Sequence, residues 1–406
     1  MLAEFRKNRI DWLFVFCILL LCCYGLLAVY STTFNSNNST IQQNFDRQLL
    51  WIAIGLALGF VTVLLPPNFF HMFAYIFYFG IVFLLILLDF LPRPEGAARW
   101  FEFGILKFQP SEFMKPVLVL AFARYISDNE RSVNNYKILL VAFLMILVPF
   151  ALVLKQPDLG TSLTYLIIAI PMLYWQGLSS LTIFIICTPF ITFIASFNYW
   201  TFFIVILLIS GVLYISRRGA LLFWSVFTVN IIVGSLAPVL WNKLHDYQQL
   251  RILTFLGLVS DPKGIGYQII QSKVAVGSGG ILGKGFLQGT QTQLRFLPAQ
   301  HTDFIFSVLA EEWGFVGAIV VLITFFLFLK RGIDAAATSH HRYLSLITIG
   351  LVSMFMFQIV LNIGMTLGIM PVTGIPLPFI SYGGSSMVTS MIMACLMLRT
   401  FVDLKR

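Results

Sequence analysis

Residues 304–329 read FIFSVLAEEWGFVGAIVVLITFFLFL, an apolar run in which only Glu311 and Glu312 are ionisable. About 20 apolar residues in a helix cross the hydrocarbon core of a bilayer, so this run predicts a membrane-spanning helix. His301, Thr302 and Asp303 stand directly before it. An aspartate at this position either caps the helix by accepting backbone N–H bonds or performs chemistry at the membrane surface.

Similar runs recur along the whole chain, which has 406 residues, 59% of them apolar and 11% charged. This composition predicts an all-α, polytopic membrane bundle of 10–12 helices that forms one domain over residues 1–406. It excludes a water-soluble enzyme and a nucleic-acid-binding protein. The five cysteines fall inside apolar runs and lack metal-ligand spacing, which excludes a disulfide scaffold. The predicted spans are 11–31, 48–66, 69–91, 111–126, 137–154, 160–175, 180–196, 198–215, 220–241, 304–329, 343–368 and 379–401.

Basic clusters orient these spans. With twelve spans, five clusters fall on the side that also holds both termini, and short loops rich in Lys and Arg face the cytoplasm. The clusters are Arg6, Lys7 and Arg9; Arg124, Arg131 and Lys137; Arg217 and Arg218; Lys330, Arg331 and Arg342; and Arg399, Lys405 and Arg406. We therefore expect both termini in the cytoplasm and the remaining loops outside.

Three outer segments stand out, at residues 92–110, 155–160 and 242–303. The longest contains the amphipathic stretches RILTFLGL and GYQIIQSKVAV, which predict helices lying at the membrane interface. It also contains GSGGILGKGFLQGT, which fails as a nucleotide-binding P-loop because Ser278 replaces its first glycine and Gly285 its final Ser or Thr. We expect these glycines to permit tight turns or close backbone approach to a bound head group, in a loop folded over the outer mouth of the bundle.

Ionisable groups gather at the outer ends of the spans, although a charge in the bilayer centre costs roughly 2.5–3.5 kcal/mol on insertion scales. They are Glu112, Lys115, Lys155, Asp158, Asp303, Glu311 and Glu312. Glu112 and Lys115 are three residues apart and are expected to pair on one helix face. This distribution predicts one polar site at the outer leaflet. The outer loops also carry excess positive charge, which indicates either an anionic ligand such as a phosphate or long loops that escape the orientation rule.

Several of these residues also have purely structural interpretations. Asp303 is a favoured type of helix N-cap. Asp158 lies in QPDLG, a stretch whose Pro, Asp and Gly suit a turn between two spans. Trp100 fits the aromatic belt at a membrane interface. From the residues alone, both interpretations stay open at each of these positions.

Residues 362–386, NIGMTLGIMPVTGIPLPFISYGGSS, resemble the signature of the shape, elongation, division and sporulation (SEDS) family. RWFEFGILKFQPSEFMK, KQPDLGTS, GYQIIQSKVAVGSGGILGKG and HTDFIFSVLAEEWG resemble its other conserved blocks, in the same order. The resemblance covers essentially the whole chain, and GKGFLQGTQTQLRFLP is more similar to the elongation branch than to the division branch.

This resemblance implies a peptidoglycan glycosyltransferase that polymerises lipid II at the outer face of the cytoplasmic membrane during cell elongation. It implies a class B penicillin-binding protein as crosslinking partner, together with other elongation proteins and membrane lipids. Asp303 falls on the family's essential aspartate, as catalytic base and as ligand of a possible divalent cation, Mg or Mn. No organic cofactor is implied. The expected substrate-binding residues are Trp100, Arg99, Glu112, Lys115, Asp158, Lys273, Lys284 and Ser381, the basic ones being candidates to stabilise the leaving pyrophosphate.

Two departures accompany the resemblance. Family members have ten spans, so the surplus near 176–218 predicts an extra helical hairpin. Arg295 and Gln300 put in doubt an auxiliary carboxylate upstream of Asp303. Two other functions stay open: a lipid II flippase, which would need a polar path through the bilayer, and a non-catalytic scaffold, which would tolerate Asp303→Asn.

Overall fold

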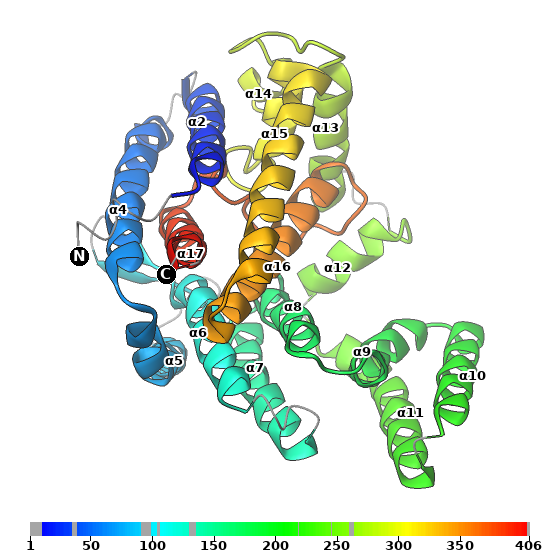
Figure 1. Cartoon of the computed structure of the whole chain (residues 1–406). Coiled ribbons are helices and arrows are strands. Elements are labelled where there is room, and N and C mark those ends of the chain that lie inside the picture. Colours follow the sequence, from blue (N-terminus) through cyan, green and yellow to red (C-terminus); the bar gives the residue numbers. More distant parts are fainter. Residues whose placement is uncertain are drawn as a thin grey trace. The chain divides into compact units, whose positions relative to one another are not determined.

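The computed structural model describes residues 10–34, 39–90, 99–103, 106–129, 135–217, 219–244, 246–259 and 264–403 (Figure 1). The all-α prediction is confirmed, since each of the twelve predicted spans is a helix. Within the described ranges, nine helices are long and apolar enough to cross a membrane. These nine are α2 (Trp12–Phe34), α4 (Asn44–Leu64), α5 (Pro67–Phe90), α7 (Tyr136–Lys155), α10 (Tyr199–Ser216), α11 (Ala220–Asn242), α15 (Ile305–Thr338), α16 (Arg342–Thr366) and α17 (Gly384–Asp403).

Three further helices occupy the other predicted spans: α6 (Pro110–Asp128), α8 (Leu159–Gln176) and α9 (Ser180–Ala195). With 16 residues, α9 is apolar but short. The exact count of twelve spans therefore stays a prediction. One predicted boundary is wrong, because α17 begins at Gly384 and not at residue 379. Residues 379–383 form an irregular turn in which Phe379 has a φ of 63°.

The chain divides into two compact units, Met1–Gln176 with Ser260–Arg406, and Gly177–Val259. In the first unit α16 is buried along most of its length, because its apolar side chains cover every face and α15, α8, α6 and α17 pack around it. On the other side of α15 lies α2, and α17 packs on α4. Helices α5 and α7 bury only a narrow stripe and expose aliphatic and aromatic side chains, as expected of helices facing lipid.

The second unit contains α9, α10, α11 and the short α12 (Asp246–Phe255). Buried Asn230 joins α9 to α11, donating from Nδ2 to Thr188 Oγ1 at 3.0 Å and accepting from Thr192 Oγ1 at 2.7 Å. Such hydrogen bonds between apolar helices are a common means of association in membranes. The predicted extra hairpin at 176–218 corresponds to α9 and α10 of this unit, and its status as an insertion stays a prediction.

The described parts of the three segments predicted to lie outside are more ordered than the sequence suggests. Strand β1 (Phe101–Phe103) pairs antiparallel with β2 (Leu106–Phe108), and this hairpin was not predicted. In the long loop, α13 (Ile265–Ser278) packs on α15 and α16, and α14 (Thr290–Gln293) packs on α2 and α15. The glycine-rich stretch packs against α15 at a kink in that helix, at Gly314. There Phe315 N donates to Gly280 O at 2.9 Å. Its glycines permit close approach to the backbone of α15, since a Cβ at Gly279 or Gly283 would clash with the carbonyl oxygens of Ala310 and Glu312.

Candidate active site

The segment 301–304 enters α15 without using Asp303 as the cap. Helix α15 begins at Ile305, and its N-cap residue is Phe304, where no side-chain cap hydrogen bond forms. Asp303 therefore lies one residue before the cap position and is partly exposed. The interpretation of Asp303 as the N-cap of this helix is therefore wrong, since the N-cap position is occupied by Phe304.

The signature loop between α16 and α17 fixes this segment by hydrogen bonds to its backbone. Ser381 Oγ donates to Thr302 O at 2.6 Å and accepts from Leu377 N at 2.8 Å. Tyr382 N donates to His301 O at 2.9 Å. Ser381 is buried, so in this structure it positions the segment before α15. Its predicted contact with substrate stays a prediction.

Asn362, from the last turns of α16, completes the support of Asp303. Its Nδ2 donates to Asp303 O at 3.0 Å and to Ile375 O at 2.8 Å, and the side chain is fully buried. Gly374 has a φ of +74°, and a Cβ there would lie 3.7 Å from Asp303 Oδ2. A glycine is needed here for its left-handed backbone, and the loop consequently passes close to the carboxylate.

The turn at residues 155–160 contacts the same loop, between Gly160 and Thr373. Asp158 caps α8, accepting from Thr161 N at 3.1 Å and from Thr161 Oγ1 at 2.9 Å. Arg99 donates to the carbonyl oxygens of Gln156 and Pro157, at 3.1 and 2.6 Å. A Cβ on Gly160 would lie 2.6 Å from Thr373 O, so the start of α8 touches the signature loop one residue from Gly374. Asp158 and Arg99 thus shape a wall beside the loop that approaches Asp303.

Glu112 and Lys115 form the predicted pair on α6. Lys115 Nζ lies 2.6 Å from Glu112 Oε1, and both side chains are almost fully buried. Tyr165 of α8 donates to Ser111 O at 2.7 Å, which ties this end of α6 to the helix that Asp158 caps. Trp100 directly precedes β1 and is 44% exposed. The hairpin it begins is held to the start of α17, since Ser385 Oγ donates to Lys107 O at 3.0 Å.

The two lysines of the long loop have different surroundings. Lys273 lies on α13 and is exposed, with its ammonium end against Gly368 at the start of the signature loop. Lys284 Nζ lies 2.8 Å from Glu311 Oε1, and Glu311 also accepts from the backbone N of Gln291 and Thr292. Glu311 is fully buried, so this network fixes the glycine-rich loop on α15. The predicted role of either lysine in binding pyrophosphate stays a prediction, and Lys273 has the more suitable position.

The profile of the FtsW, RodA and SpoVE family of cell cycle proteins matches residues 11–200 and 181–405. The chain belongs to this family. The two matched ranges overlap at residues 181–200, which lie inside the predicted extra hairpin.

Relatives and solved structures cover nearly the whole chain. Peptidoglycan glycosyltransferase MrdB of Escherichia coli (strain K12) is 35% identical over 390 residues, which is 95% of this chain and 91% of that protein. A chain of a peptidoglycan synthase complex that coordinates polymerisation and crosslinking is 30% identical, with a TM-score of 0.72 and 98% of each chain covered. The rod shape determining protein RodA of Thermus thermophilus is 26% identical, with a TM-score of 0.64 and 97% of each chain covered. The chain is accordingly a polytopic inner-membrane protein.

Two polar residues at this site had no role assigned from sequence. Asn362 holds the backbone of Asp303, as described above. Gln48 of α4 is fully buried, donates to Ser381 O at 3.2 Å and accepts from Gly383 N at 3.4 Å. Gln48 carried no signal of such a role in the sequence, since it follows Asn44, Asp46 and Arg47 at the polar start of α4. Asn362 did, because it lies in a mostly apolar helix, where a buried amide must find hydrogen-bond partners. Its partner could not be read from the sequence.

The donor set limits how a divalent cation could bind. Among the described residues no group of three or more His, Cys, Asp or Glu side chains could hold a metal ion. Asp303 is a single carboxylate, which fits the type of site where one carboxylate and substrate phosphates share a Mg²⁺ ion. Burial lowers the pKa of neighbouring His301, which favours its neutral form and keeps a second positive charge away from this position.

Proposed function

We propose that this chain polymerises lipid II into glycan strands, with Asp303 as the general base. The observation that carries the proposal is the presentation of Asp303. It stands at the entrance of an apolar helix, it is not the cap of that helix, and Asn362 and Ser381 fix the backbone around it. A carboxylate held in this way at the membrane surface is suited to accept a proton from a lipid-borne hydroxyl.

The reaction class is that of its relatives: this chain is a peptidoglycan glycosyltransferase. In the proposed reaction the sugar 4-hydroxyl of the acceptor attacks the anomeric carbon of the donor. The new C–O bond forms as the bond to the lipid pyrophosphate breaks, with inversion at that carbon. Asp303 takes the hydroxyl proton, and the pyrophosphate leaves with the bonding electrons. Lys273 is our first candidate to stabilise its charge, since its ammonium lies at the start of the signature loop.

A divalent cation, Mg or Mn, is part of the proposal only as a supplement. When bound, it would neutralise pyrophosphate charge, and Asp303 would hold it together with substrate oxygens. The protein's own residues keep their roles. Asn362 and Ser381 position the carboxylate, and Arg99 with Asp158 shapes the adjacent wall.

We further propose the topology and partner. The basic clusters place both termini in the cytoplasm, and Asp303 then faces outside, where lipid II is presented. A class B penicillin-binding protein is the proposed crosslinking partner. The matched synthase complex, which coordinates polymerisation and crosslinking, supports such an assembly. The elongation branch is supported by similarity to a rod shape determining protein.

Polymerisation of labelled lipid II in detergent tests this function. The full chain is combined with a class B partner that carries an inactive transpeptidase site, and glycan ladders are resolved on a gel. Wild type is expected to give ladders, and Asp303→Asn is expected to fall by about 10²–10⁴, the usual contribution of a general base. Equal ladders from both would refute the role of Asp303. No ladders from wild type, with competent substrate and partner, would favour a flippase or a scaffold.

A further inference from the structure

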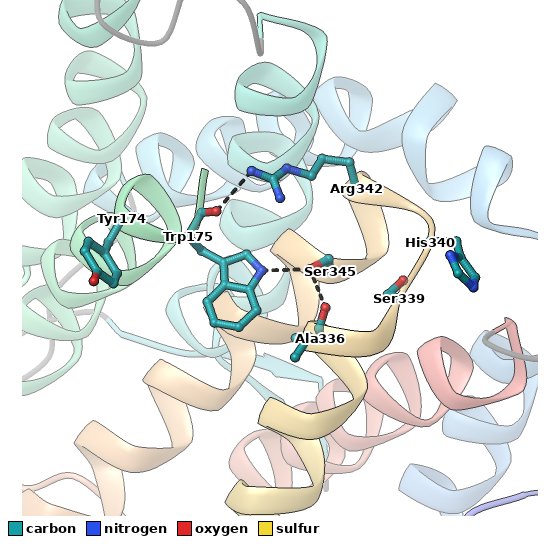
Figure 2. Close-up of a pocket in the computed structure, with 8 residues that line it drawn as sticks. Tyr174, Trp175, Ala336, Ser339, His340, Arg342 and Ser345 are labelled. Carbon is teal, nitrogen blue, oxygen red and sulfur yellow. Dashed lines mark hydrogen bonds between the residues drawn. The ribbon is translucent and has the colours of Figure 1, made fainter. Parts of the chain in front are cut away.

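A pocket of about 560 Å³ lies where α15 ends and α16 begins (Figure 2). Asp303 precedes the opposite end of α15. The pocket is formed by the last residues of α8, the last turn of α15, and the short turn that leads into α16. Its lining residues are Tyr174, Trp175, Ala336, Ala337, Ser339, His340, Arg342 and Ser345. None of them belongs to the proposed active site. The volume is typical of pockets that bind small ligands.

The pocket favours an anion. Arg342 and His340 contribute basic side chains, and no Asp or Glu is among the eight lining residues. Arg342 is also the first residue of α16, a helix of 25 residues whose N-cap, His341, makes no side-chain cap hydrogen bond. The positive end of the helix dipole therefore adds to the charge of the arginine.

A hydrogen-bond network fixes the polar floor before any ligand arrives. Trp175 Nε1 donates to Ser345 Oγ at 2.8 Å, and Ser345 Oγ donates to Ala336 O at 2.7 Å. Arg342 Nη2 donates to Trp175 O at 3.0 Å, and the three bonds can be followed in Figure 2. The bond from Ser345 also occupies a carbonyl oxygen of the last turn of α15, which would otherwise face an anion. The indole and the guanidinium are therefore held in place, which lowers the entropic cost of binding.

The pocket lies where the two spanning helices α15 and α16 join, and the end of a spanning helix is where lipid headgroups are expected. Tyr174 is 61% exposed and Trp175 is partly exposed beside it, as aromatic residues are at a membrane interface. A ligand with a phosphate and an apolar body matches basic and aromatic side chains placed together. Basic pockets between membrane helices bind anionic headgroups in this manner.

We propose that this pocket binds the phosphate of an anionic phospholipid headgroup. The phosphodiester contacts the Arg342 guanidinium, and the glycerol end of the lipid lies on Tyr174 and Trp175, while His340 adds positive charge at the rim of the pocket. With the orientation proposed above, the lipid belongs to the cytoplasmic leaflet. The inference does not rest on the glycosyltransferase function, and polymerisation is not its readout.

Native mass spectrometry of the purified full chain tests this site. The protein is titrated with phosphatidylglycerol or with phosphatidylcholine of the same acyl chains. Wild type is expected to retain one phosphatidylglycerol in preference to phosphatidylcholine. Arg342→Gln is expected to bind it about fivefold more weakly, since one basic side chain near a membrane surface contributes about that factor.

A second variant guards against misfolding, because Arg342 also bonds to Gln176 of α8. Ala337→Glu adds a carboxylate to an exposed position of the lining and removes no hydrogen bond of the network. It is expected to weaken phosphatidylglycerol binding as well. The matched controls Arg217→Gln and Ala220→Glu make the same charge changes at exposed positions outside the lining, and they are expected to bind as wild type does.

Three results would overturn the proposal. The first is equal retention of both lipids, or phosphatidylglycerol binding that neither pocket variant changes. The second is displacement of the lipid by inorganic phosphate at equal concentration, which would assign the pocket to a free anion. The third is loss of a co-purifying acidic protein from both pocket variants while lipid binding persists, which would assign it to a protein partner.

Discussion

Asp158 and Asp303 both stand shortly before a helix, and both adjoin the signature loop, yet the structure uses them differently. Asp158 directs its carboxylate to the N–H and hydroxyl of Thr161 and thereby caps α8. Asp303 precedes a helix whose N-cap is Phe304, and its own backbone carbonyl is what Asn362 holds. The carboxylate of Asp158 accepts hydrogen bonds from α8, whereas Asn362 holds the backbone of Asp303 and the carboxylate of Asp303 lies beside Gly374.

The difference shows how a bundle can present a carboxylate at its rim. A capping side chain gains stability from the hydrogen bonds that restrict it. For Asp303, hydrogen bonds to the backbone of residues 302 and 303 set the position of the carboxylate. The signature loop supplies those bonds, and the turn capped by Asp158 supports the same loop through Gly160.

The largest expected effect on stability comes from the Glu112–Lys115 pair on α6, the helix tied by Tyr165 to α8, which Asp158 caps. Glu112→Gln leaves the Lys115 ammonium buried without its carboxylate, which should lower the free energy of unfolding by about 3–5 kcal/mol. Unfolding in mixed micelles measures the change. Asp128→Asn is the matched control on the same helix, because its ion pairs with Arg124 and His71 are partly exposed and each should contribute at most about 1 kcal/mol. Equal losses would mean that the buried pair does not hold α6.

Asn362→Ala tests the backbone support of Asp303. The loss of two donated hydrogen bonds should let the carboxylate shift, and a displacement of about 1 Å can lower the rate of a positioned reaction about 10²-fold. Lipid II polymerisation is the measurement. Asn230→Ala is the matched control, since Asn230 is equally buried and bonded but lies in the other unit. Equal losses of activity in both variants would contradict the role of Asn362 in positioning Asp303.

Asp158→Ala should act on stability more than on chemistry. Removal of a helix cap lowers the free energy of unfolding by about 1 kcal/mol, within a usual range of roughly 0.5–2 kcal/mol. Polymerisation by the folded fraction should fall less than for Asn362→Ala. A collapse of activity with unchanged unfolding would instead place Asp158 in direct contact with substrate.

The smallest effect is a pH dependence from His301. Burial lowers its folded-state pKa below the ordinary value of 6.5, so the unfolded chain binds the proton first as the pH falls. The stability that His301 contributes is therefore present above pH 6.5 and is lost as the pH falls through the lowered pKa. Unfolding measured from about pH 8 to about pH 5 should show this loss in wild type and less of it in His301→Gln. His340→Gln, at an exposed position, is the control, and an identical slope in all three proteins would contradict the prediction.

Local patterns predicted the membrane helices and the Glu112–Lys115 pair, because both depend on residues within one helix. The partners of Asp303 were out of reach, since Asn362 is 59 residues away and the contact exists only once α15 and α16 pack. Lys284 illustrates the same limit. Its charge suggested a pyrophosphate ligand, but its carboxylate partner, Glu311, lies 27 residues along the chain. The β-hairpin at 101–108 was missed because its three-residue strands are too short to show an alternating pattern.

The most direct test compares Asp303→Asn with Asp158→Asn, each measured for both unfolding and lipid II polymerisation. The account predicts that Asp303→Asn unfolds as wild type does, within about 0.5 kcal/mol, and loses polymerisation by about 10²–10⁴. Asp158→Asn keeps a side chain that caps a helix about as well as Asp does, so it should match wild type in stability and retain polymerisation. If the folded fraction of Asp303→Asn polymerised lipid II as well as Asp158→Asn does, the central claim would be contradicted.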